Sequence, residues 1–163
     1  VRAVREAMGP EGRIRVDANG GWNLDEAEHA IHALAEFDLE YVEQPCATID
    51  QLAEISLRTK YMGIPIAADE SVTTGKEAAR AVRAKACELA TVKLAKTGGI
   101  GGVAGIAQHL PVYLSSALDG PVGIAAAAHG AQAIYREAPD PGVAHGLATQ
   151  RLFADTIEAT LTP

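Results

Sequence analysis

The sequence contains few aromatic residues and no excess of positive charge. Aromatic side chains make up 4% of its 163 residues, and the formal net charge at pH 7 is −7. Proteins that bind nucleic acid or a membrane surface carry a basic patch, so this charge balance argues against both classes. No apolar run approaches the roughly 20 residues of a membrane-spanning helix. We therefore predict a single-domain cytoplasmic protein that binds neither nucleic acid nor a membrane.

Cysteine is scarce, and histidine lacks the spacing of a metal site. Cys46 and Cys87 are the only cysteines, and they form no Cys-x-x-Cys pair. Two reduced thiols are expected of that pattern in the cytosol. The five histidines form neither an HxxxH nor an HExxH motif, which argues against zinc. His29 and His32, three residues apart in a predicted helix, are expected to face solvent.

What the sequence does contain is a series of short apolar runs that each end in a polar residue. Asp17, Glu43 and Asp69 end three such runs at intervals of 26 residues. Lys93 ends a fourth run 24 residues later, and Ser115 ends a fifth after 22 more. A strand with its crossover helix needs about 30 residues or slightly fewer, and parallel strands require such crossovers. The spacing therefore predicts successive βα units.

Helix signals alternate with these runs. Asn23 and Glu26 form a capping box, and apolar residues recur after it at helical spacing. Alternating strands and helices indicate an α/β protein with a parallel sheet. We expect about six strands, at residues 13–16, 39–43, 64–68, 89–92, 112–114 and 142–147. We expect helices at residues 1–8, 23–37, 48–62, 74–86, 103–110 and 122–134, and a weak one at 151–163.

The polar residues at the strand ends predict a site. The carboxyl ends of parallel strands meet on one face, where barrel enzymes keep their chemistry. Asp17, Glu43 and Asp69 supply hard oxygen ligands of the kind that suits Mg²⁺. One carboxylate after an apolar run is more often a cap or turn residue, but three in equivalent positions favour a metal site.

Lys93 ends its run at the same level as the carboxylates. It could move a proton or stabilise a developing anion, or it could form an ion pair with one of the three carboxylates. The glycine-rich stretch 98–102 could bind an anion through backbone N–H groups or form a plain tight turn. The residues alone leave both alternatives open.

Four motifs together resemble the enolase superfamily, muconate-cycloisomerase subgroup. In order, they are Asp17-Ala18-Asn19, Glu43-Gln44-Pro45, Asp69-Glu70-Ser71, and Lys93 followed by Gly98-Gly99. The resemblance extends to about Thr149. Within the subgroup, residues 112–124 resemble the o-succinylbenzoate synthases of the actinobacterial type.

The resemblance implies a modified (β/α)7β barrel with an α+β capping domain. Residues 1–163 would form an incomplete, C-terminal part of this metal-binding barrel domain, without the capping domain and the first strands. Asp17, Glu43 and Asp69 would bind Mg²⁺, or Mn²⁺ in its place, and the metal would hold the carboxylate of a small-molecule substrate. Asn19 and Glu70 would support these ligands from behind, as metal ligands usually require.

The resemblance also implies a reaction. Removal of the α-proton gives an enediolate, and loss of the β-hydroxyl completes a syn dehydration of 2-succinyl-6-hydroxy-2,4-cyclohexadiene-1-carboxylate in menaquinone synthesis. Lys93 would match the family's sixth-strand lysine, which faces the enediolate opposite the base. Ser115 and Gly146 would contact the succinyl end of the substrate.

Two departures from the family pattern matter. The family's acid/base lysine, in a Lys-x-Lys motif on the second strand, would precede Val1, so we expect residues 1–163 alone to be inactive. The mandelate-racemase branch is disfavoured, because its seventh-strand histidine is replaced by Ser115-Ser116. The alternatives are an N-acylamino acid racemase or dipeptide epimerase on the same scaffold, and a non-catalytic fragment of such an enzyme. The sequence does not predict an oligomeric state.

Overall fold

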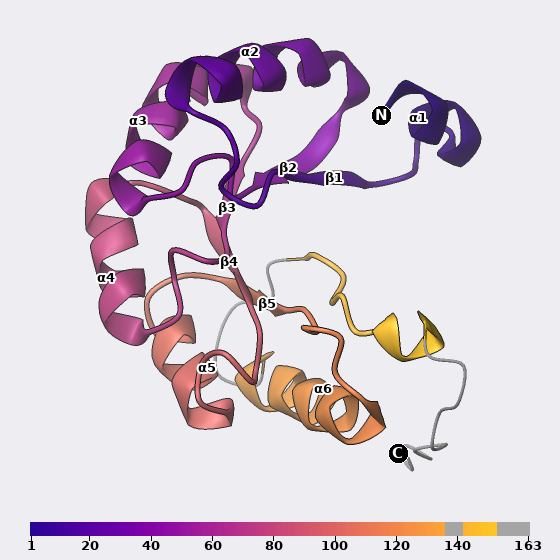
Figure 1. Cartoon of the computed structure of the whole chain (residues 1–163), viewed down its shortest axis with the longest axis vertical. Coiled ribbons are helices and arrows are strands. Elements are labelled where there is room, and N and C mark those ends of the chain that lie inside the picture. The colour runs from indigo at the N-terminus through magenta and orange to yellow at the C-terminus, as the bar shows by residue number, and fades with distance from the viewer. Residues whose placement is uncertain (136–141, 153–163) are drawn as a thin grey trace. The chain divides into compact units, whose positions relative to one another are not determined.

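The computed structural model describes residues 1–135 and 142–152. The chain divides into two compact units. The first unit comprises residues 1–71 and 80–89. The second comprises residues 72–79 and the described residues from 90 onward. In Figure 1 the colour follows the chain through both units, from indigo at the N-terminus to yellow at residue 152.

A parallel sheet of three strands forms the centre of the first unit. Its strands are β1 (Ile14–Asp17), β2 (Leu39–Glu43) and β3 (Ile66–Ala68), and β2 pairs with both neighbours. Four of the five residues of β2 and all of β3 are buried. That is the expected pattern for parallel strands, since helices cover them. Short helical segments complete the unit: α1 (Arg2–Met8), η1 (Ala35–Phe37) and η2 (Lys60–Met62).

Two helices of the first unit begin at capping boxes. Asn23 caps α2 (Leu24–Leu34), where its side chain accepts the N–H groups of Asp25 and Glu26 while Glu26 accepts the N–H of Asn23. Thr48 caps α3 (Ile49–Thr59) in the same way with Gln51. Each box satisfies backbone donors that have no partner within the helix. Both helix starts agree with the sequence prediction.

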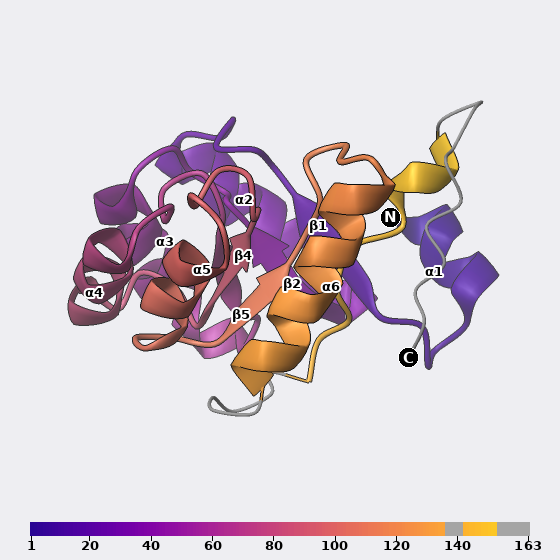
Figure 2. The same cartoon turned by 90° about the horizontal axis from the view of Figure 1, so that it is seen from below.

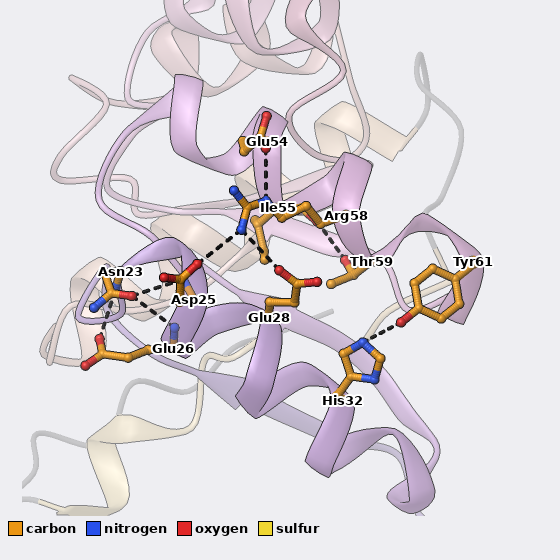
Figure 3. Close-up of polar contacts among 10 residues, drawn as sticks. All are labelled: Asn23, Asp25, Glu26, Glu28, His32, Glu54, Ile55, Arg58, Thr59 and Tyr61. Carbon is orange, nitrogen blue, oxygen red and sulfur yellow. Dashed lines mark hydrogen bonds and ion pairs between the residues drawn. The ribbon is translucent and has the colours of Figure 1, made fainter.

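The helices α2 and α3 lie side by side along the strands of the first unit (Figure 1). Figure 3 shows that Arg58 of α3 reaches three carboxylates. Its guanidinium lies 2.9 Å from Glu54, 3.1 Å from Glu28 and 3.3 Å from Asp25. The hydrogen bonds that the guanidinium donates to these carboxylates, that to Glu54 first, raise the pKa of Arg58. At the other end of the pair, Tyr61 bonds to the ring of His32.

The second unit contains the parallel pair β4 (Leu89–Val92) and β5 (Val112–Leu114). Its helices are α5 (Ile100–Ala107) and α6 (Pro121–Tyr135). Figure 2 shows α6 beside β5, on which it packs. A 3-10 turn, η3 (Thr149–Leu152), ends the described chain. The helix α4 (Gly75–Ala84) has residues in both units, and Glu77 caps its start with Thr73 and Thr74.

Two predicted elements differ from the structure. The described residues contain five strands, because the predicted strand 142–147 forms only an isolated bridge between Gly146 and Ser115. The helix predicted from residue 103 already begins at Ile100. Gly98 and Gly99 turn the chain with φ values of 79° and 96°, which lets the helix start inside the glycine run. The predicted tail helix lies outside the described residues from 153 onward.

Among the helices in residues 1–135 and 142–152, none has the length and hydropathy that crossing a membrane requires.

Candidate active site

The first two predicted ligands lie side by side at the ends of neighbouring strands. Asp17 ends β1, Glu43 ends β2, and the two residues are partners in the parallel register. The N–H of Ala18 donates to the carbonyl of Glu43 at 3.1 Å, so the pairing continues past both residues. Neighbouring strands are about 4.8 Å apart, which places the two residues within reach of one ion.

Asp69 lies one residue beyond the end of β3. Glu43 is in register with Ala67, and Asp69 follows two residues later on the same strand line. Because side chains alternate along a strand, that offset returns Asp69 to the face on which Ala67 points. The structure therefore brings the backbones of the three predicted ligands to one edge of the first unit's sheet.

The three carboxylates differ in their surroundings. Glu43 and Asp69 are buried, with 7% and 4% of their surface exposed, whereas Asp17 is exposed. The carboxylate of Asp17 accepts the N–H of Asn19 at 2.8 Å and so turns toward its own loop. As the side chains stand, no three His, Cys, Asp or Glu residues in the described part of the chain form a group that could hold a metal ion. The metal assignment therefore stays a prediction.

The two residues predicted to support the ligands occupy different positions. Asn19 lies in the turn after β1 with a φ of 49°, and its backbone N–H holds the Asp17 carboxylate. Glu70 follows Asp69 and is exposed. Asn19 thus contacts a predicted ligand through its backbone rather than its side chain.

Gln44 belongs to one of the four motifs, but sequence reasoning assigns it no role. Its side chain is fully buried. Its Oε1 accepts the N–H of Asp69 at 2.8 Å and the hydroxyl of Ser71 at 3.0 Å, and its Nε2 donates to the carbonyl of Cys46 at 2.8 Å. A polar side chain between the predicted ligand Glu43 and a proline was the only signal that could have marked it.

A second group that sequence reasoning missed lies two residues before the Asp17–Glu43 pair. Arg15 is in register with Tyr41, and its guanidinium stacks 5.0 Å from the centre of the Tyr41 ring. Its Nε lies 2.6 Å from Glu40. The register shifts between Ile14 and Arg15, at the level of Glu40. The position of this irregularity depends on how the two strands are paired, which the hydrophobic periodicity of the sequence does not determine.

Lys93 belongs to the second unit and follows β4 directly. It is half-buried, and its carbonyl accepts the N–H groups of Lys96 and Thr97 at 2.9 and 3.1 Å. The strand therefore ends in a hydrogen-bonded turn at Lys93. Lys96 is exposed. In the glycine run, a Cβ at Gly102 would meet the carbonyl oxygen of Thr97 at 1.8 Å, which supports the tight-turn alternative.

Ser115 and Gly146, predicted separately as substrate contacts, are neighbours in the second unit. They form a parallel bridge, in which Gly146 donates its N–H to Leu114 and accepts that of Ser116. A Cβ at Gly146 would lie 3.1 Å from Ser115 Oγ. The hydroxyls of Ser116 and Thr149 add a bond of 2.5 Å across the same two segments.

Both cysteines are free thiols, as predicted. Burial raises the pKa of Cys46 above its usual value. Burial, followed by the nearby Glu88 carboxylate, raises the pKa of Cys87 to about 12. Neither thiol therefore forms a reactive thiolate at neutral pH.

Known proteins resemble this chain along its whole length. The o-succinylbenzoate synthase of Thermobifida fusca is 43% identical over 166 residues, which cover 100% of this chain and 50% of that protein. The chain spans about half the length of the curated relatives it matches.

Solved structures share the fold. The dipeptide epimerase of Cytophaga hutchinsonii, solved with Mg and the dipeptide D-Ala-L-Val, is 27% identical with a TM-score of 0.80, covering 95% of this chain and 42% of that one. The N-succinyl Arg/Lys racemase of Bacillus cereus is 26% identical with a TM-score of 0.83, covering 96% and 42%. These similarities confirm the predicted fold class, part of an enolase-type barrel.

The family described as "Enolase C-terminal domain-like" matches residues 1–158. The predicted strand ends, the parallel pairing and the solved relatives all agree with that match. The chain therefore belongs to the enolase C-terminal domain-like family.

Proposed function

We propose that the protein containing this chain is an o-succinylbenzoate synthase that depends on Mg²⁺. The observation that carries this proposal is the 43% identity to a protein of that name across all of this chain. The reaction is the syn dehydration of 2-succinyl-6-hydroxy-2,4-cyclohexadiene-1-carboxylate to 2-succinylbenzoate, a step of menaquinone synthesis. The proposed partner is thus a small-molecule carboxylate, and the proposed location is the cytoplasm.

Asp17, Glu43 and Asp69 are the proposed metal ligands. The donor set fits a hard divalent ion, because it offers three carboxylates on consecutive parallel strands, two of them buried. Asp17 would exchange its bond to the Asn19 N–H, or share its second oxygen, when the ion binds. Mn²⁺ offers a chemically similar alternative.

When bound, Mg²⁺ would stabilise negative charge on the substrate carboxylate. The chain's own residues would act on the other parts of the substrate. The ammonium of Lys93, held at the end of a buried strand, would stabilise charge that develops as the α-proton leaves. The bridged pair Ser115 and Gly146 would contact the far end of the substrate, where a small residue leaves room for it.

A racemase or epimerase is the second candidate. The solved relatives with TM-scores of 0.80 and 0.83 carry those names, so the scaffold suits either chemistry. Their identities of 27% and 26% are lower than the 43% of the synthase. We therefore rank the synthase first.

The test is an assay of the full-length gene product with Mg²⁺ and the cyclohexadiene substrate. The loss of substrate absorbance measures the reaction. We expect rapid dehydration that EDTA abolishes and added Mg²⁺ restores. Racemisation of an N-acylamino acid or dipeptide, with no dehydration, would replace the synthase by the second candidate. No turnover of either substrate class would contradict both and favour the non-catalytic alternative.

A further inference from the structure

We propose that Gln44 is a positioning residue for the metal ligands: its buried amide and its backbone fix the segments that carry Asp17, Glu43 and Asp69 in one arrangement. The inference rests on the proposed metal role of these three carboxylates. In this role Gln44 would touch neither the metal nor the substrate. It would act by holding the metal ligands in place.

The backbone of Gln44 bonds to both neighbouring segments. Its N–H donates to the carbonyl of Ala67 at 2.8 Å, and its carbonyl accepts the N–H of Gly20 at 2.7 Å. Ala67 lies two residues before Asp69, and Gly20 lies three residues after Asp17. Gln44 therefore continues the pairing of β2 with both neighbouring segments beyond the strand end.

The side chain of Gln44 completes the connection to Asp69. Its Oε1 accepts the N–H of Asp69 at 2.8 Å, together with the N–H and hydroxyl of Ser71 at 3.4 and 3.0 Å. Its Nε2 donates to the carbonyl of Cys46 at 2.8 Å. Since Asp69 and Ser71 present N–H donors and Cys46 presents a carbonyl, only one orientation of the amide satisfies every partner. The amide is thus fixed as well as buried.

The backbone conformation at this position is unusual. Gln44 has a φ of 36°, in the left-handed region that residues with a Cβ seldom adopt. Such a conformation persists only where the surroundings impose it. At Gln44 those surroundings are the two backbone bonds and the three side-chain partners just described. The strained residue directly follows the predicted ligand Glu43. Its side chain reaches the predicted ligand Asp69, which is 26 residues from Glu43 in the sequence.

This arrangement would reduce the conformational entropy that the ligand residues lose when the metal binds. A ligand that is held in place before the ion arrives costs less to order, and groups that orient metal ligands typically contribute 10- to 100-fold in affinity. Gln44 orients the backbone of Asp69 directly.

The experiment compares Gln44→Met, Gln44→Glu and Ile55→Val in the full-length protein. Methionine has a similar length and removes every side-chain hydrogen bond. Glutamate, in its protonated form, keeps an oxygen that can accept the Asp69 N–H and an O–H that can donate to the Cys46 carbonyl. Ile55 is fully buried in α3, outside the segments that carry the predicted ligands, and serves as a control for lost stability. Calorimetry gives the Mg²⁺ affinity, the electron paramagnetic resonance spectrum of bound Mn²⁺ reports ligand geometry, and hydrogen exchange follows the Asp69 amide.

We expect Gln44→Met to weaken Mg²⁺ binding 10- to 100-fold, to change the Mn²⁺ spectrum and to speed exchange at Asp69. Gln44→Glu should keep the wild-type spectrum and the protected amide, and Ile55→Val should keep the affinity. Wild-type Mg²⁺ affinity and spectrum in Gln44→Met would overturn the inference. If Gln44→Met does not fold, Gln44→Glu decides: an altered Mn²⁺ spectrum with a protected Asp69 amide would overturn it. A wild-type protein that binds no divalent ion would instead contradict the proposed metal site.

Discussion

The strand ends of the two units are built differently. In the first unit, backbone bonds and the amide of Gln44 join the residues after β1, β2 and β3, and two of the three predicted ligands are buried. In the second unit, a hydrogen-bonded turn follows β4 and a bridge to Gly146 follows β5, and the loops beyond them expose residues such as Lys96, Gly98 and Leu118. Leu118 has a φ of 62° and is 63% exposed.

The difference separates two tasks. Metal ligands must be held within a narrow geometry, and the first unit supplies fixed supports for them. Substrate contacts are commonly carried by loops on a rigid scaffold, which vary between enzymes of one fold. The comparison is consistent with our proposal that the first unit binds the metal and that loops of the second unit contact the substrate. Variants of each unit can test metal binding and substrate recognition separately.

The largest effects are expected when a predicted metal ligand or the cationic residue Lys93 is replaced. Replacing Glu43 by Gln should abolish both Mg²⁺ binding and turnover in the full-length protein. Replacing Lys93 by Met should lower turnover by about 10²- to 10⁴-fold and leave the Mg²⁺ affinity unchanged, because Lys93 lies outside the ligand set. Calorimetry and the absorbance assay provide the two measurements. Loss of Mg²⁺ binding in Lys93→Met would show that the tasks are not separate.

Gly20→Ala should weaken the support of the first unit. Gly20 has a φ of 69°, and a Cβ there would lie 3.2 Å from the Cα of Ala47. The left-handed conformation alone costs about 1–2 kcal/mol for a residue with a Cβ. We expect the free energy of unfolding to fall by at least that amount, measured by urea denaturation. Gly63→Ala is a control with open space but the same kind of φ, so a larger loss at Gly20 isolates the contact with Ala47.

Gly146→Ala should affect recognition without affecting the metal. The added Cβ would stand 3.1 Å from Ser115 Oγ, so the serine must move by a few tenths of an ångström. We expect KM to rise about tenfold, which is typical of one added carbon in a binding site. The Mg²⁺ affinity should stay at its wild-type value. An unchanged KM would remove Ser115 and Gly146 from the predicted substrate contacts.

The smallest effect is a pH dependence at the start of α4. Burial on its own would raise the pKa of Glu77, but hydrogen bonds from Thr73 and Thr74 outweigh it and lower the pKa. A lowered pKa in the folded state means that the ionised carboxylate stabilises the protein above the unfolded value of about 4.3. That contribution is lost as the pH falls through the folded-state pKa.

Glu77→Gln measures this contribution. The carboxylate is partly exposed, so we expect the variant to lose about 0.5–1 kcal/mol of unfolding free energy at pH 7. Urea denaturation at several pH values should show the difference from wild type shrinking below about pH 4. A difference that does not change with pH would attribute the loss to packing instead of charge.

The sequence predicted those features that depend on local spacing. The capping box of Asn23 and Glu26 is a short-range signal, and the structure has it. The 26-residue interval between Asp17 and Glu43 predicted neighbouring strand ends, and the two residues are register partners. Such features follow from periodicity, because each is determined within one strand or one βα unit.

The sequence did not predict the contacts between distant segments. The bonds from Gln44 to Asp69 and Ser71 join residues 25 and 27 positions apart, and no local pattern marks them. The predicted strand 142–147 shortened to one bridge, and the N–H of Leu114 in β5 donates to the ring of His145 instead of to a strand carbonyl. These contacts depend on register and on the turn after each strand, which composition does not determine.

A crystal structure of the full-length protein grown with Mg²⁺ tests the central claim most directly. The account predicts one Mg²⁺ ion with oxygens of Asp17, Glu43 and Asp69 at about 2.0–2.1 Å, and with the Gln44 amide still bonded to Asp69. A Mg²⁺ ion bound elsewhere, or bound by fewer than two of these carboxylates, would contradict it.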